Sequence, residues 1–104
     1  MVREIIWSVK ADRDRFKIFK YWDNRNKSQT YRNKSQAYSF KLNQSLLKSA
    51  ELVADMPELG IATNVPSTRF TIILDYSMYY RITPTRIEII TIWDHRRNPK
   101  KLTF

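Results

Sequence analysis

The residue types best suited to phosphate chemistry gather at the end of the last apolar run of the chain. That run, residues 86–93, leads directly into residues 94–101, which hold four Lys/Arg and the only histidine. An imidazole exchanges protons near neutral pH, and arginine and lysine bind phosphate. A strand would hold these groups more rigidly than a loop. The segment therefore predicts a phosphate-binding surface at a strand end, with a solvated basic tail as the alternative.

Composition restricts the classes of function. The 104 residues suffice for one small domain, and the 42% apolar and 13% aromatic content argues against disorder. The chain has no cysteine and one histidine, which excludes disulfides, thiolate chemistry and multi-histidine metal sites, and we expect no cofactor. It shows neither a membrane-spanning run nor a signal-peptide layout, so we expect a cytoplasmic protein. The net charge of +9 predicts an anionic partner, either nucleic acid or an acidic protein.

Two helices are predicted after an opening strand at residues 4–10. From residue 11 the apolar spacing becomes helical, with an aromatic side expected to face a core. That side consists of Phe16, Phe19 and Trp22, widened by Ile18 and Tyr21. The second helix has a near-3.6 period that runs until Pro57 stops it. Its apolar residues are Tyr38, Leu42, Leu46, Ala50 and Val53, with Leu47 beside them.

An internal duplication lies between the two helices. Residues 25–31 (RNKSQTY) recur as residues 32–38 (RNKSQAY), with six of seven positions identical. Seven residues are close to two helical turns, so the insertion could lengthen a helix by about 10 Å without rotating its apolar side. Either Ser28 or Ser35 could cap the second helix.

Three β-rich runs, residues 69–74, 76–82 and 86–93, complete the predicted fold. The order is a strand, two helices and three strands. It predicts a single α+β domain over residues 1–104, in which a helical hairpin covers one face of a mainly antiparallel sheet. Strand alternation places Tyr79 and Arg81 on one face and Tyr80 and Ile82 on the other.

This layout resembles the RelE/ParE superfamily of bacterial toxins from type II toxin–antitoxin systems over nearly the whole chain. The order and spacing of several short pieces carry the resemblance. The pieces are Ala11-Asp12-Arg13-Asp14 after the opening strand, Tyr21-Trp22, Tyr38-Ser39 with Lys41-Leu42, Met56-Pro57-Glu58-Leu59-Gly60, the Tyr-rich residues 76–82, and Ile87-Glu88-Ile89-Ile90 leading to Arg96-Arg97. The duplication departs from the family pattern, which needs one copy.

The resemblance implies a growth-arresting toxin that a cognate antitoxin holds inactive, and the basic charge suits an acidic antitoxin. RelE-like members cut messenger RNA on the ribosome, whereas ParE-like members poison DNA gyrase. The two targets are close alternatives, and we rank ribosome-dependent, metal-independent RNA cleavage slightly first. A nucleic-acid-binding module without toxicity is the third interpretation.

RNA cleavage without a metal needs a proton donor, a proton acceptor and cations beside the phosphate. His95 is the candidate acid or base, Arg97 and Arg96 are the candidate charge stabilisers, and Tyr79 or Tyr80 is the candidate for orienting or stacking a base. Candidate nucleic-acid contacts are Lys100, Lys101, Arg81 and Arg86.

Arg97 resembles a catalytic arginine of RelE-like enzymes by its position. The other catalytic cations of those enzymes are absent, because Ser77 stands where their earlier arginine lies and residues 70–74 lack their lysines. Arg69, Arg81 and Arg86 could substitute for these cations. The losses favour the gyrase alternative.

Overall fold

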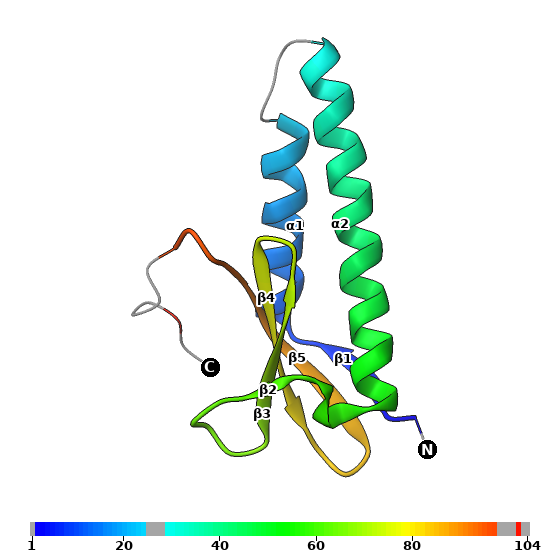
Figure 1. The fold of residues 1–104 in the computed structure, drawn as a ribbon, viewed down its shortest axis with the longest axis vertical. Coiled ribbons are helices and arrows are strands. Elements are labelled where there is room, and N and C mark those ends of the chain that lie inside the picture. The colour runs from blue at the N-terminus through cyan, green and yellow to red at the C-terminus, as the bar shows by residue number, and fades with distance from the viewer. Residues whose placement is uncertain (1, 25–28, 98–101, 103–104) are drawn as a thin grey trace.

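A computed structural model of the chain describes residues 2–24, 29–97 and 102, with side chains at 23, 24 and 29–37 left undescribed. A five-stranded sheet of order β1-β5-β4-β3-β2 packs against two antiparallel helices (Figure 1). In chain order the elements are β1 (Glu4–Trp7), α1 (Val9–Asn24), α2 (Gln29–Asp55), the 3-10 helix η1 (Pro57–Leu59), β2 (Ile61–Ala62), β3 (Thr68–Ile73), β4 (Tyr76–Ile82) and β5 (Arg86–Asp94).

The predicted α+β fold is confirmed, and the sheet is mainly antiparallel, as expected. β1 pairs with β5 in parallel, whereas the pairs β5–β4, β4–β3 and β3–β2 are antiparallel. The two-residue strand β2 was not predicted, because so short a segment shows no periodicity. Among the described helices, none combines the length and the apolarity that would span a bilayer.

The first helix begins two residues earlier than its apolar pattern indicated. Ser8, which the sequence placed in the opening strand, occupies the N-cap position: its Oγ accepts a hydrogen bond from the Ala11 N–H at 3.0 Å. The same hydroxyl donates to the carbonyl oxygen of Ile90 in β5 at 2.8 Å. One side chain therefore ends β1, starts α1 and attaches the start of α1 to β5.

The hydrophobic core lies between the helical hairpin and one face of the sheet. Its fully buried members include Ala11, Leu42, Leu46, Met78, Tyr80, Ile87 and Ile89. Ile18, Phe19 and Trp22 pack against this core as predicted. The prediction was wrong for Phe16 and Tyr21, which are 66% and 45% exposed. Phe16 precedes Ile18 by two residues, so it projects about 160° away from it around the helix.

Leu47 is a further exception, since it is 41% exposed although its neighbour Leu46 is fully buried. A helix turns about 100° per residue, so a residue beside an apolar stripe can lie outside the contact between the helix and the core.

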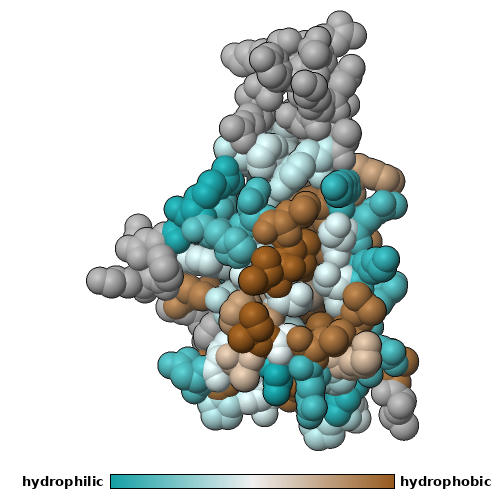
Figure 2. Space-filling model, in the orientation of Figure 1, coloured by the Kyte–Doolittle hydropathy of each residue, from teal (hydrophilic) through white to brown (hydrophobic). Residues whose placement is uncertain are grey.

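Figure 2 shows that hydrophobic surface gathers in the middle of the face in view, between hydrophilic flanks.

The duplication coincides with an overhang of α2. The rings of Trp22 and Tyr38 lie 4.4 Å apart and set the level at which the two helices meet. α1 ends two residues above that level, at Asn24, whereas α2 begins nine residues above it, at Gln29. The difference of seven residues is one repeat unit and corresponds to about 10 Å of helix. Figure 1 shows α2 extending past the end of α1.

Of the two serines predicted as alternative N-caps of α2, the structure settles the role of one. Ser35 lies inside α2 and does not cap it, while Ser28 falls outside the described residues. The rest of the first repeat copy is likewise outside the description, at residues 25–27, or described by backbone alone, at residues 29–31.

Tyr80 fixes the turn that leads from α2 into the sheet. Its buried hydroxyl donates to the Pro57 carbonyl at 2.7 Å and accepts from the Gly60 N–H at 2.9 Å. A Cβ on Gly60 would lie 2.3 Å from that hydroxyl and 2.9 Å from the Phe70 carbonyl oxygen. Glycine is therefore required here by close approach. The sequence left Tyr80 as a second candidate for function, and the structure gives it this structural role.

Deleting residues 25–31 should shorten the molecule without unfolding it. The remaining repeat restores the sequence RNKSQ after Asn24, and the overhang of α2 disappears while Trp22 and Tyr38 keep their contact. We expect the maximum dimension in small-angle X-ray scattering to fall by about 10 Å. The thermal unfolding midpoint should change by only a few degrees, and cooperative unfolding lost in the deletion variant would contradict this account.

Gly60→Ala should destabilise the fold by about 2 kcal/mol or more, because the methyl group clashes with the Tyr80 hydroxyl and the Phe70 carbonyl. Tyr80→Phe should cost about 1 to 2 kcal/mol, since it leaves the Gly60 N–H and the Pro57 carbonyl without this partner. Chemical denaturation of both variants and their combination measures the coupling. We expect the double variant to lose less than the sum of the two, and strict additivity would show that the groups do not interact.

Candidate functional site

The sheet has a second face, which the helices do not cover. Cross-strand partners project to the same side, and one row of partners is Ile72, Ser77 and Trp93. A neighbouring row contains Phe70 and Tyr79, whose rings lie 5.1 Å apart. These residues are outside the core cluster that packs on the helices. We call this surface the open face.

Two of the predicted catalytic residues lie at the β5 end of the open face. His95 follows Trp93 by two residues, and its Nε2 lies 2.7 Å from the Ser77 Oγ. A neutral Nε2 accepts this hydrogen bond, whereas a protonated one donates it. The Arg97 guanidinium lies 4.6 Å from the centre of the Trp93 ring. Imidazole, hydroxyl and guanidinium groups therefore share one corner of the sheet, and Arg97 forms no ion pair with a described residue.

Tyr79 lies on the same face, as the strand alternation predicted, opposite Thr91 of β5. Its side chain is half-buried beside Phe70, and this burial raises the pKa of the Tyr79 hydroxyl. The hydroxyl is thus neutral at physiological pH, so it can donate a hydrogen bond but cannot act as a base. Its ring is positioned for packing.

Arg96 does not join this group. Its Nε and terminal nitrogen bind both oxygens of the Asp94 carboxylate at 2.6 to 3.1 Å, and its guanidinium lies 5.4 Å from the Tyr21 ring, on the helix side of the strand. The hydrogen bond from Arg96 holds the pKa of Asp94 below its ordinary value, and the same pairing raises the pKa of Arg96. Arg96, predicted with Arg97 as a charge stabiliser, therefore lies apart from Arg97 and is paired with Asp94.

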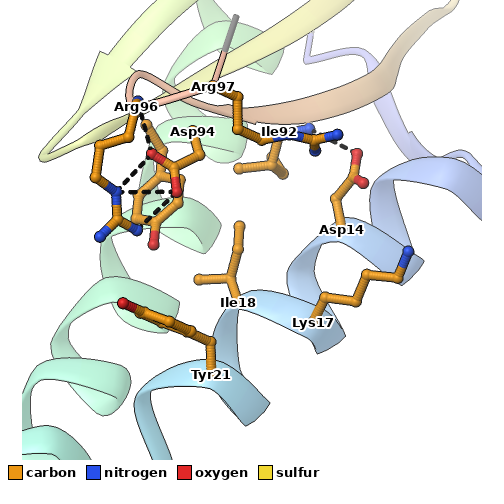
Figure 3. A pocket seen from close by; sticks show the side chains of 9 residues that line it. Asp14, Lys17, Ile18, Tyr21, Ile92, Asp94, Arg96 and Arg97 are labelled. Carbon is orange, nitrogen blue, oxygen red and sulfur yellow. Dashed lines mark hydrogen bonds and ion pairs between the residues drawn. The ribbon is translucent and has the colours of Figure 1, made fainter. Parts of the chain in front are cut away.

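The helix side of the strand end contains a cavity of about 320 Å³ between α1 and β5. Its floor includes Ile18 and Ile92, and Figure 3 shows the Asp94–Arg96 pair on one side and Asp14 on the other. Arg97 also lines the cavity, so it lies at the strand edge that separates this cavity from the open face.

Asp14 closes the edge of β5 where β1 has ended. One of its carboxylate oxygens accepts hydrogen bonds from the Thr91 hydroxyl at 2.5 Å and the Ile92 N–H at 3.2 Å. The same oxygen lies 3.9 Å from the Lys10 ammonium. This side chain is only 15% exposed. Its charge is thus balanced within the fold.

The remaining predicted contacts do not cluster with His95 and Arg97. Arg86 begins β5 and pairs with Glu4 at 3.7 Å, so eight strand residues, about 26 Å, separate it from Asp94. Arg81 is exposed opposite Glu88, about 20 Å from the same end. Arg69, a possible substitute cation, donates to the Gly60 carbonyl at 2.7 Å. Lys100 and Lys101 lie outside the described residues.

Sequence reasoning missed the partners of the basic cluster. An Asp side chain often accepts a hydrogen bond from the backbone N–H two residues later and so favours a turn. Here the Asp94 carboxylate accepts such a bond from the backbone N–H of Arg96 at 2.9 Å. That signal could have assigned Arg96 to the turn. No local signal pairs Ser77 with His95 or Asp14 with β5, because these contacts join distant parts of the sequence.

Asp94→Asn should lower the thermal unfolding midpoint by about 2 to 4 °C at neutral pH, by removing a charge-assisted fork that is partly exposed. The pKa of Asp94 is lowered in the folded state, so its stabilisation is present above about pH 4 and is lost as the pH falls through the folded value. Melting curves of both proteins from pH 6 to pH 2 test this. The difference should shrink toward pH 2, and a constant difference would contradict it.

Comparisons with known proteins identify the family of the chain. A family model described as the ParE toxin of the type II toxin-antitoxin system, parDE, matches residues 5–99. Ten solved chains match the fold significantly. One of them, described as the chromosomal ParDE TA system from P. aeruginosa, has a TM-score of 0.68 and 18% identity and covers 89% of this chain and 96% of its own. No curated protein sequence matches the chain significantly. Because the family match spans most of its length, this protein belongs to the ParE toxin family of type II toxin–antitoxin systems.

Proposed function

We propose that this ParE-family toxin arrests growth in the bacterial cytoplasm by binding DNA gyrase, and that a cognate antitoxin restrains it. The composition of the open face carries the proposal. Aromatic and aliphatic side chains dominate it: Ile72 is 58% exposed, Phe70 and Tyr79 are half-buried, and Trp93 is buried. An exposed apolar surface on a rigid sheet suits contact with a protein better than contact with a polyanion.

The arrangement of cations supports binding over RNA cleavage. The negative charge of a pentacovalent phosphate is stabilised most when several cations converge on it. By the resemblance to RelE-like enzymes, Ser77 of β4 and the β3 run Phe70–Ile73 stand where those enzymes carry cations. Arg96 is held by Asp94, and Arg81 and Arg86 lie far along the strands. Arg97 is the one arginine near His95 among the described residues that forms no ion pair.

RNA cleavage is the alternative, and one observation favours it. The short Ser77–His95 hydrogen bond holds an imidazole beside Arg97 on an accessible corner. In this alternative His95 would exchange the proton of the 2′-hydroxyl or of the leaving oxygen, and Arg97 would stabilise charge on the phosphate. Tyr79 would contribute its ring to stacking.

Induced expression followed by pulse labelling separates the two functions. We expect DNA synthesis to fall before protein synthesis, with messenger RNA intact. Ile72→Glu should abolish the arrest, because it places a charge in the proposed contact surface without touching the core. Leu52→Glu is the matched control, since Leu52 is 44% exposed on α2 and away from the open face. His95→Ala should remain toxic.

Purified gyrase provides the direct readout. The wild-type chain should inhibit supercoiling, and the Ile72 variant should not. Early collapse of translation with cleaved messenger RNA, abolished by His95→Ala or Arg97→Ala, would overturn the gyrase proposal and establish the nuclease alternative. Harmless expression of well-folded wild-type protein would refute both.

A further inference from the structure

The cavity between α1 and β5 is lined by five charged side chains, and they are not equivalent. Both carboxylates already have partners within the fold. Asp14 contacts Thr91, Ile92 and Lys10. Asp94 pairs with Arg96. Lys17 and Arg97 also line the cavity, and neither forms an ion pair with a described residue. The positive charge available to a ligand is therefore that of Lys17 and Arg97.

The rest of the cavity is suited to an apolar group. Ile18 and Ile92 form a hydrophobic floor, and the ring of Tyr76 closes it from the sheet side while its hydroxyl accepts a hydrogen bond from the Trp22 indole at 2.9 Å. In Figure 3 Ile18 lies between the two acidic side chains, and Arg97 extends across the top of the cavity. A volume of about 320 Å³ accommodates one or two side chains of a partner.

We propose that this cavity binds an acidic segment of the cognate antitoxin, with an apolar side chain on the Ile18–Ile92 floor and a neighbouring carboxylate between Lys17 and Arg97. The inference rests on the antitoxin partner that the family implies and does not depend on which target the toxin attacks. Charge complementarity carries it, since the chain has a net charge of +9 and the cavity has two cations without an ion-pair partner.

The paired carboxylates at the rim distinguish a peptide from a nucleic acid. A nucleic-acid backbone carries a negative charge at every nucleotide. It would pass close to the carboxylates of Asp14 or Asp94 on either side of the cavity and be repelled by them. A single carboxylate next to an apolar side chain avoids both. The floor also lacks a free aromatic face for stacking a base, because Arg96 lies over Tyr21.

Occupation of the cavity would act on the open face through Arg97. Its guanidinium stacks on Trp93 from the strand edge, so a carboxylate in the cavity would compete for the same group. The antitoxin would then restrain the toxin partly by holding Arg97 on the helix side of β5.

The test is the affinity of the full toxin chain for its purified cognate antitoxin, measured by titration calorimetry at low and high salt. Lys17→Glu and Arg97→Glu should each weaken binding by about tenfold or more, with a larger loss at low salt. Lys20→Glu is the matched control, because Lys20 is exposed on the same helix and lies over Phe16 outside the cavity. Its affinity should stay within about twofold of wild type.

Overlapping synthetic peptides of the antitoxin should locate the segment. The peptide that binds the wild type should fail when its acidic residue is replaced by the corresponding amide, and a charge reversal in the antitoxin should restore binding to Arg97→Glu. Unchanged antitoxin affinity in both cavity variants would overturn the proposal. So would loss of binding to a single-stranded RNA or DNA oligonucleotide in these variants with antitoxin affinity intact. Failure of the gyrase assay would leave these affinities unaffected.

Discussion

The geometry of this toxin depends on how the edge of β5 is closed beyond the end of β1. β1 ends with Trp7 opposite Ile89, whereas β5 continues to Asp94. Ser8 and Asp14 from the start of α1 take the place of the missing strand, through hydrogen bonds to the Ile90 carbonyl and the Ile92 N–H. These bonds satisfy backbone groups that would otherwise form an open edge, and they hold α1 against the strand. The strand end that carries His95 and Arg97 is rigid for this reason.

That rigid end divides two surfaces of different character. On one side the open face carries the exposed Ile72 beside the half-buried Tyr79, while Trp93 is buried at 6% exposure beneath Arg97. On the other side the cavity presents two available cations above an aliphatic floor. Arg97 lies at the edge between them and touches both. A toxin built in this way can offer different surfaces to its target and to its antitoxin while one residue couples the two.

Local patterns predicted the elements well, and the misses have physical causes. The long helix, its stop before Pro57 and the last three strands follow from periodicity and β-forming residues. The start of α1 was misplaced because Ser8 reads locally as part of a strand, and its cap is stabilised by a contact with Ile90, far away in sequence. Phe16 was assigned to the core because aromatic residues at helical spacing usually are, yet it lies on the solvent side of α1.

The sequence by itself determined the fold class, the family resemblance and the residue types at the end of β5, because these are properties of local pattern and order. It also predicted that the extra heptad could lengthen a helix without rotating its apolar side. Only the tertiary structure decided what those residues can do. It turned Arg96 toward Asp94, placed His95 on Ser77, separated Arg81 and Arg86 from the strand end and opened a cavity beside Arg97. These outcomes depend on strand register and on the packing of α1 against β5, which bring together residues that no local pattern relates.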